Sequence, residues 1–516
     1  MKMQKKFIII GMGLSGLVFF CRLIEEFIKK RETGYRIFIV EKNHDYLATG
    51  AAYHINNPSI WTLNNTAASF KITPNGKNLA EWMKAYPKLW QPYFSGINEE
   101  YVPRALAGRY LQYYYQEYKQ KAISHGIVIE EFFEEIIDVE YENNDHWKIS
   151  TANNIIFNAD FLSLCLGHAS FNNYNNLKSN KNFIHNPADL LQLKNIPTNA
   201  SIYILGGQST FIDIALWLVC SHKVTAPIFS VTRNTNIITT KSHKEKIDGS
   251  VLTEFANTLK NNYGSNTMSI TNGNLLFWEY YKKAVKNPIT KQPTTKEALS
   301  SQLARYDLKF TDVQIGSVDE LRSFVADFYF SPCYHLFWDR LCVDDKEKFH
   351  QHFYSLFIAY LTGTTPVNAR LLLNLYNKNK IIELNGLIDI QYNERIKKFN
   401  LSFKDGTIHT AEYVINATGL SYDLNQDTSI LIKNLIKKGY IVPKKWGGMM
   451  ITDNYQAINN NQQIQKNLIC IGPTALYAHK YPSPYASFLA MESATLALEG
   501  IKATIYGQRK YRLSKL

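Results

Sequence analysis

The spacing of apolar residues changes twice near the start of the chain. Phe7–Ile10 is a short apolar run that is typical of a buried strand. Apolar positions at helical spacing then run from Leu14 to Ile28, and a second apolar run covers Arg36–Val40. Strand, helix and strand in this order predict a βαβ unit whose two strands are parallel.

Glycines stand between the first predicted strand and the helix, in the sequence Gly11-Met-Gly13-Leu-Ser-Gly16. This spacing permits a tight turn, lets the backbone approach a pyrophosphate, and leaves the amides of the helix N-terminus to bind the phosphate charge. We therefore expect a dinucleotide to contact Gly11, Gly13, Leu14, Ser15 and Gly16. The alternative is a glycine-rich turn that binds no nucleotide.

The second predicted strand is followed by Glu41 and Lys42. In dinucleotide-binding folds an acid at this place accepts hydrogen bonds from the ribose hydroxyls. Glu41 follows Gly16 by 25 residues, somewhat more than the usual interval of about 20, because the helix between them is long. We expect both residues to lie at the cofactor.

A second strand, glycine turn and helix begin at Ser201, but their glycine motif is degenerate. If Gly206 is the first motif glycine, Gln208 replaces the second; if Gly207 is the second, Leu205 replaces the first. The next strand is followed by Thr232-Arg233 in place of an acid, and an arginine there suits the 2′-phosphate of NADPH. We expect NADPH to contact Gly206, Gly207, Gln208, Ser209 and Arg233. The alternative is a nucleotide-binding type of fold that holds no nucleotide.

Composition excludes several classes of protein. With 516 residues, of which 45% are hydrophobic and 20% charged, the chain is long enough for two to four globular domains. Its six cysteines are scattered without a CxxC pair, so we expect no zinc site, no disulfide scaffold and a reducing, cytoplasmic location. The net charge of +13 is spread along the chain and suggests small anionic partners as readily as nucleic acid; we expect no nucleic-acid binding. Glycines interrupt the short apolar run near the N-terminus, so we expect no transmembrane segment.

Three further segments complete a resemblance to a known family. They are Gly50-Ala-Ala-Tyr53, Trp61-Thr-Leu-Asn64 and Tyr101–Leu111, which contains Pro-Arg-x-x-x-Gly-x-Tyr-Leu. Together with the two βαβ units, they resemble the FAD-NAD(P)-binding family of two-dinucleotide-binding flavoproteins, which is related to flavin-dependent N-hydroxylating monooxygenases. The resemblance implies that Asn64 and Arg104 help to bind FAD. A helix-terminal salt bridge is the alternative role for Arg104.

The resemblance also implies the architecture. We expect an α/β protein with two Rossmann-like dinucleotide-binding domains, a discontinuous FAD domain and a helical insertion. The expected segments are the first part of the FAD domain (1–195), an NADPH-binding-like βαβ unit (196–240), a mostly helical substrate region (241–370) and the second part of the FAD domain (371–516). Two late strands, ending near Gly419 and Gly472, are expected to complete the FAD sheet, with Gly419 at the cofactor.

The function that the resemblance implies is an FAD-dependent, NADPH-using oxidoreductase. We expect a monooxygenase that hydroxylates a small amine-bearing metabolite, such as an amino acid, through a flavin hydroperoxide in a dry pocket. His479–Tyr485 is either part of that pocket or a surface loop, and Trp446–Met450 is a candidate edge of it. The alternatives are an FAD-dependent oxidase or dehydrogenase that does not use NADPH, and a non-catalytic flavin-binding regulatory protein. Neither the catalytic residues nor the oligomeric state follow from the sequence.

Overall fold

The computed structural model describes residues 5–142, 146–168, 174–234, 236–241, 247–264, 266–306, 317–419, 423–445, 447–475 and 486–506. The chain forms two compact units. The first joins Met1–Asn173 to Leu420–Leu516, and the second is Tyr174–Gly419. The first unit is therefore built from two stretches that lie far apart in the sequence. The segment limits predicted above at 195, 240 and 370 stay predictions.

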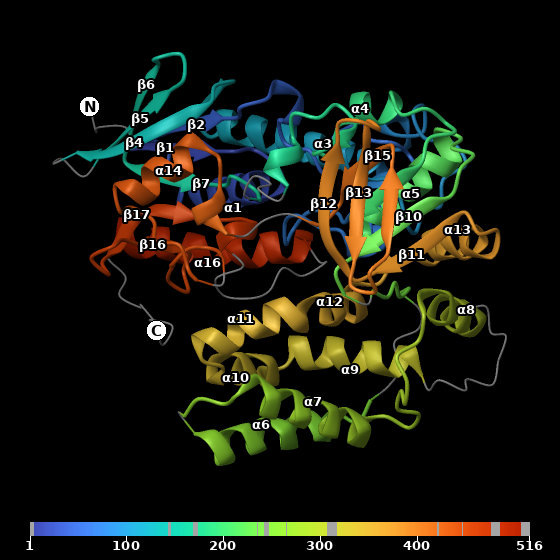
Figure 1. Cartoon of the computed structure of the whole chain (residues 1–516). Helices are drawn as coiled ribbons and strands as arrows, with labels where there is room; N and C mark the ends of the chain where they lie inside the picture. The colour runs from blue at the N-terminus through green and yellow to red at the C-terminus, as the bar shows by residue number, and fades with distance from the viewer. Residues whose placement is uncertain are drawn as a thin grey trace. The chain divides into compact units, whose positions relative to one another are not determined.

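A six-stranded sheet with the order β16-β17-β7-β1-β2-β3 forms the centre of the first unit (Figure 1). All neighbouring strands are parallel except β16 and β17. In this register Ile10 lies opposite both Val40 and Leu164, so the carboxyl ends of three strands meet at one edge. The strands are β1 (Lys5–Ile10), β2 (Tyr35–Val40), β3 (Val128–Phe132), β7 (Phe161–Leu164), β16 (Gln456–Ile458) and β17 (Ile464–Cys470).

Helix α1 (Leu14–Lys30) is buried around most of its circumference, because two other helices pack against it. These are α3 (Arg104–Ser124) and α16 (Ala486–Tyr506). A small antiparallel sheet is formed by β4 (Ile136–Glu142), β5 (His146–Thr151) and β6 (Ile156–Ala159), and α14 (Ile430–Lys437) packs on β4. The short helix α2 (Leu79–Ala85) begins with a capping box between Asn78 and Glu81.

The second unit contains a five-stranded parallel sheet with the order β11-β10-β9-β15-β8. Its strands are β8 (Phe183–Ile184), β9 (Ile202–Leu205), β10 (Ile228–Thr232), β11 (Ile381–Asn385) and β15 (Tyr413–Asn416). Helix α5 (Ser209–Leu216) follows β9 and continues as a π-helical turn over Trp217–Ser221. An antiparallel sheet is formed by β12 (Leu387–Asn393), β13 (Lys398–Phe403) and β14 (Ile408–Ala411).

Helices dominate the segment between β10 and β11 (Figure 1). They are α6 (Gly249–Tyr263), α7 (Ile270–Ala284), α8 (Thr295–Tyr306), α9 (Val318–Phe330), α10 (Pro332–Arg340), α11 (Val343–His352), α12 (Tyr354–Thr362) and α13 (Pro366–Asn377), while α4 (Leu190–Lys194) precedes β9. The predicted α/β class, the discontinuous first unit and the helical insertion are thus confirmed.

One strand was assigned to the wrong sheet. The sequence analysis expected the strand before Gly419 to complete the FAD sheet, but β15 pairs with β9 and β8 in the second unit. The late strand that does join the first sheet is β17, which pairs with β7. An apolar strand that ends in small residues fits the edge of either parallel sheet, so its pattern does not specify its partner.

Candidate functional site

The first glycine loop is held by backbone contacts that only glycine allows. Gly11 has a φ of 89°, and its amide donates a 2.8 Å hydrogen bond to the carbonyl of Val40. A Cβ on Gly11 would lie 2.4 Å from the carbonyl oxygen of Cys165, and one on Gly16 would lie 2.1 Å from that of Gly11. These two glycines are therefore required by the loop itself, as a tight turn and as a close approach of helix to strand.

Gly13 has room for a small side chain. Its φ of −75° suits any residue, and a Cβ there would meet only the backbone of Gly50, at an ordinary 3.5 Å. Helix α1 begins directly after it without a side-chain cap and without an acidic residue in its first turn, where Leu14 and Ser15 lie. Amides of a first helical turn that lack a side-chain cap bind anions well. The space beside Gly13 therefore fits the pyrophosphate of a dinucleotide.

Glu41 links the glycine loop to the end of β2. Its Oε2 accepts a 2.8 Å hydrogen bond from the amide of Met12, and its Oε1 accepts one of 3.2 Å from the amide of Asn43. A carboxylate has about four acceptor positions, so it can also accept hydrogen bonds from a ribose. The ammonium of Lys42 lies 2.8 Å from Glu135 Oε1, and its side chain is 69% exposed.

Glycines from two other strands reach the same edge of the sheet. Gly167 follows β7 with a φ of 78°, and Gly472 follows β17 with a φ of 116°. A Cβ on Gly472 would lie 3.6 Å from Ser15 Oγ and 3.9 Å from the amide nitrogen of Gly167. Three carboxyl strand ends thus meet at the first turn of α1, where ligands bind to open parallel sheets. From the sequence, Gly472 was named only as the end of a late strand and Gly167 was not selected, although a glycine shortly after a buried strand was the available signal.

The three segments that carry the family resemblance come together in the first unit. The amide of Arg104, the first residue of α3, donates to the carbonyl of Trp61 at 2.8 Å, and its Nε donates to that of Thr62 at 3.1 Å. A Cβ on Gly108 would lie 2.0 Å from the carbonyl oxygen of Tyr53. Arg104 therefore positions the segment that ends at Asn64, which is half-buried.

The second loop repeats the geometry of the first. Gly206 has a φ of 114°, its amide donates a 2.8 Å hydrogen bond to the carbonyl of Val231, and a Cβ on it would lie 2.2 Å from the carbonyl oxygen of Ala417. Gly206 is therefore the counterpart of Gly11, which settles the register that the sequence left open. Gln208 stands at the second glycine position and the buried Phe211 at the third.

The side chain of Gln208 is turned toward the segment after β10. Its Nε2 donates to Asn236 Oδ1 at 2.6 Å and to the carbonyl of Ile237 at 2.9 Å. Asn236 in turn donates from Nδ2 to the carbonyl of Gly207 at 2.8 Å. Ser209 then begins α5, which has no side-chain cap. Asn236 was missed because nothing in the sequence relates it to a loop 28 residues earlier.

Arg233 and Gly419 lie at the carboxyl edge of the second sheet. Because Val231 corresponds to Val40, Thr232 stands at the position of Glu41 and Arg233 at that of Lys42. Arg233 is exposed. Gly419 has a φ of 93° two residues after Ala417, as Gly167 has a φ of 78° two residues after Cys165.

The cysteines of the first unit are buried thiols. Burial raises the pKa of Cys470 to about 12, and burial together with Cys470 raises that of Cys165. All six cysteines of the chain are free. A thiol with a raised pKa is a poor nucleophile at neutral pH, so these side chains are structural.

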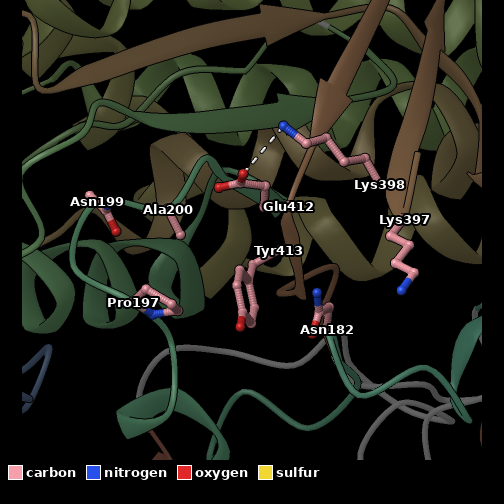
Figure 2. A pocket seen from close by; sticks show the side chains of 8 residues that line it. All are labelled: Asn182, Pro197, Asn199, Ala200, Lys397, Lys398, Glu412 and Tyr413. Carbon is pink, nitrogen blue, oxygen red and sulfur yellow. Dashed lines mark ion pairs between the residues drawn. The ribbon is translucent and has the colours of Figure 1, made fainter.

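A polar hollow of about 330 Å³ lies at the opposite edge of the second sheet (Figure 2). Ala200 precedes β9, and Glu412 precedes β15. Glu412 pairs with Lys398 at 3.2 Å and accepts a hydrogen bond from the amide of Ser201. Because this is the amino-terminal edge of the strands, the hollow is separate from the loop at Gly206.

Residues 8–169 match the sequence model of the FAD-NAD(P)-binding family. This part of the chain is similar to that family. The match covers the glycine loop, Glu41 and the segments around Tyr53, Asn64 and Arg104. No curated protein matches the chain by sequence.

Solved structures of flavin monooxygenases share the fold over nearly the whole chain. One is the FAD-bound cadaverine monooxygenase of Erwinia amylovora, with a TM-score of 0.57 at 14% identity, covering 98% of this chain and 96% of that one. Another is the L-lysine 6-monooxygenase of Pseudomonas syringae, with a TM-score of 0.57 at 11% identity, covering 97% of this chain and 99% of that one. A third is the ornithine N-hydroxylase of Kutzneria sp. 744, solved with FAD, NADP⁺ and L-ornithine. Its TM-score is 0.56 at 11% identity, and the match covers 97% of this chain and 100% of that one. The chain therefore has the fold of these proteins. The predicted resemblance to the FAD-NAD(P)-binding family is confirmed over residues 8–169.

No helix among the described residues is both long and apolar enough to cross a membrane. Across the same ranges, no group of three or more His, Cys, Asp or Glu side chains is arranged to hold a metal ion. His479–Tyr485 and Trp446, which the sequence analysis considered for the substrate pocket, lie outside the described residues.

Proposed function

We propose that the protein is an FAD- and NADPH-dependent monooxygenase that hydroxylates a small amine-bearing metabolite. The observation that carries the proposal is the matched geometry of two glycine loops, one in each unit. Gly11 and Gly206 share a left-handed φ, a hydrogen bond to the strand that follows the helix and a close contact with a third strand. Two such loops in one chain support one site for each of two dinucleotides.

The first loop supports FAD binding. The amides of Leu14, Ser15 and Gly16 would bind its pyrophosphate in the space beside Gly13, and Glu41 would bind the ribose. Arg104 would act by positioning the segment up to Asn64, and Lys42 would lie at the outer end of the site. Bound FAD would supply the redox chemistry, by taking up electrons from NADPH and reacting with oxygen, and the protein would exclude water around it.

The second loop supports NADPH binding. Ser209 begins α5, and its amide would face a phosphate together with the backbone of Gly206 and Gly207. Gln208 is hydrogen-bonded to Asn236, so its side chain stabilises the loop and leaves the helix N-terminus accessible. Arg233 is exposed directly after β10, where its guanidinium would bind the 2′-phosphate in a bidentate manner. Gly419 would border the same edge.

The substrate class rests on the structural neighbours. By name, these act on cadaverine, lysine and ornithine, each of which is a small molecule with a primary amine. The likeness supports an amine as the substrate of this chain and leaves the particular amine open. An FAD-dependent oxidase that takes electrons from its substrate is the second candidate, because Gln208 and Phe211 replace two motif glycines.

The decisive experiment measures oxygen uptake by the FAD-loaded protein with NADPH and each of three amines: cadaverine, L-lysine and L-ornithine. Hydroxylated amine formed in proportion to the NADPH consumed would support the proposal. Oxygen uptake that needs an amine but no NADPH would favour the oxidase. NADPH oxidation that yields only hydrogen peroxide with every amine would refute amine hydroxylation in this set. The Gly13→Ala variant serves as the control for loss of FAD.

A further inference from the structure

The helical part of the second unit encloses an apolar cavity that is distinct from both glycine loops. Its volume is about 130 Å³, and its walls come from α7, α9, α10, α11 and α12 together with Phe353, the residue between the last two helices. Of its 14 lining residues, nine are aromatic, and they include Phe277, Trp278, Phe328, Tyr334 and Phe357. Aromatic side chains from five helices thus gather around one space.

Phe328 of α9 organises the aromatic walls. Its ring packs edge to face against Phe277 of α7, at 5.3 Å and 81°, and against Phe337 of α10, at 5.7 Å and 82°. Phe357 of α12 contacts Phe349 of α11 at 6.0 Å and Phe328 at 6.5 Å. These rings support one another from different helices, and their mutual packing positions the walls of the cavity.

The described walls of the cavity offer an ion no side chain of opposite charge. Among the described residues that line the cavity there is no Asp, Glu, Lys, Arg or His, and the polar side-chain groups there are the Asn274 amide, the indole N–H of Trp278 and the phenols of Tyr334 and Tyr360. An ammonium or carboxylate that enters without a partner loses hydration that such walls cannot replace. These walls therefore favour a neutral occupant over the charged form of the amine proposed as substrate.

The size of the cavity limits the occupant further. An apolar cavity of roughly 150 Å³ stays dry and accepts one benzene molecule, and the volume here is close to that. Access is available, because Asn274, Trp278 and Phe353 are only partly buried while Phe328 and Phe337 behind them are buried. Pockets with mostly aromatic walls and a few polar groups are typical of small-molecule sites.

We propose that this cavity, which we call the aromatic cavity, binds a small neutral molecule with a single aromatic ring. The ring packs edge to face among the phenylalanines, and one hydrogen-bonding substituent reaches Asn274 at the partly exposed side. The site is independent of the proposed amine hydroxylation. It stands whether or not NADPH reduces the flavin.

The test is ¹⁹F NMR of fluorobenzene with the full-length, FAD-loaded protein. We expect the fluorobenzene resonance to broaden and shift in a saturable manner, whereas 4-fluorobenzylammonium, which has a similar ring but a positive charge, shows no saturable change. No saturable effect of fluorobenzene would overturn the proposal. Equal or tighter binding of the cation would also overturn it, because the rings would then act as a cation-binding cage.

Two leucine-to-tryptophan variants test whether fluorobenzene binds in the aromatic cavity. Leu356→Trp places an indole in the lining and should weaken fluorobenzene binding by at least about tenfold, because it fills the space that the ligand needs. Leu275→Trp is the matched control, since Leu275 is on α7, 64% exposed and outside the lining.

A second variant covers the case in which Leu356→Trp does not fold. Val325→Ala widens the cavity and should admit 1-fluoronaphthalene, which the native cavity excludes. Unchanged binding in Leu356→Trp, or equal binding of 1-fluoronaphthalene to the native protein and Val325→Ala, would contradict the assignment.

Discussion

Gly206 lies so close to Ala417 that a Cβ on the glycine would stand 2.2 Å from the alanine carbonyl oxygen. The same relationship joins Gly11 to Cys165 in the other unit, at 2.4 Å. In both units the contact ties the glycine turn to a neighbouring parallel strand. Each unit therefore builds its turn on three strands, although only the first retains the complete glycine motif.

Replacement of Gly206 by alanine should destabilise the second unit. The side chain would be strained at a φ of 114° and would clash with backbone, which together should lower the free energy of unfolding by roughly 2 kcal/mol or more. Urea unfolding measures the change. Gly249→Ala is the matched control, because a Cβ on Gly249 would meet nothing within 4 Å and no left-handed φ is needed there. Equal stability of the two variants would disprove the packing role of Gly206.

Gly13→Ala should separate cofactor binding from folding. A Cβ there meets only backbone at 3.5 Å, so the FAD-free protein should unfold within about 1 kcal/mol of the native chain. The FAD content after purification should nevertheless fall, since the methyl group occupies the space proposed for the pyrophosphate. Gly16→Ala should instead destabilise the protein even without FAD, because of its 2.1 Å contact. Full FAD content in Gly13→Ala would place the pyrophosphate elsewhere.

Gln208→Gly restores the missing motif glycine and should still weaken NADPH binding. The substitution removes the hydrogen bonds to Asn236 and Ile237 that hold the loop. We expect the KM for NADPH to rise several-fold, consistent with about 1 kcal/mol for a typical hydrogen bond. Asn379→Gly, at an exposed residue with a φ of 51°, is the control. A lower KM in Gln208→Gly would mean that the glutamine obstructs the nucleotide.

Lys241 should make the stability of the second unit depend on pH. Burial, together with Arg322, lowers its pKa to about 7. The unfolded chain therefore binds one more proton between about pH 7 and pH 10, so the free energy of unfolding should rise with pH in this window. In Lys241→Met this rise should be smaller, as followed by urea unfolding at pH 6, 8 and 9.5. Lys260 is exposed, so Lys260→Met should leave the change of the unfolding free energy with pH as it is in the native protein. The same native change in Lys241→Met would contradict the assignment of the pH dependence to Lys241.

Much of the first site could be predicted from sequence because its residues are neighbours in the chain. Gly11, Gly16 and Glu41 lie within one βαβ unit, where strand, turn and helix follow directly from local spacing. The contact of Gly11 with Cys165 could not be predicted in the same way, since strand pairing over such a separation leaves no local pattern.

The second site shows what local patterns omit. The register at Gly206 was ambiguous because the sequence does not reveal which glycine needs a left-handed φ. The strand β15 was placed in the wrong sheet because its partner β9 lies about 200 residues earlier. A mostly helical region was predicted over 241–370, but the aromatic cavity within it depends on how five helices pack.

The central claim is tested most directly by mixing the FAD-loaded protein with NADPH or NADH in the absence of oxygen and following the absorbance of oxidised flavin. We expect NADPH to bleach the flavin rapidly and NADH to do so slowly. Arg233→Ala should slow the reaction with NADPH and leave that with NADH unchanged, because only NADPH carries the 2′-phosphate. A well-bound flavin that neither nucleotide bleaches would contradict the account and direct the search to a reducing substrate.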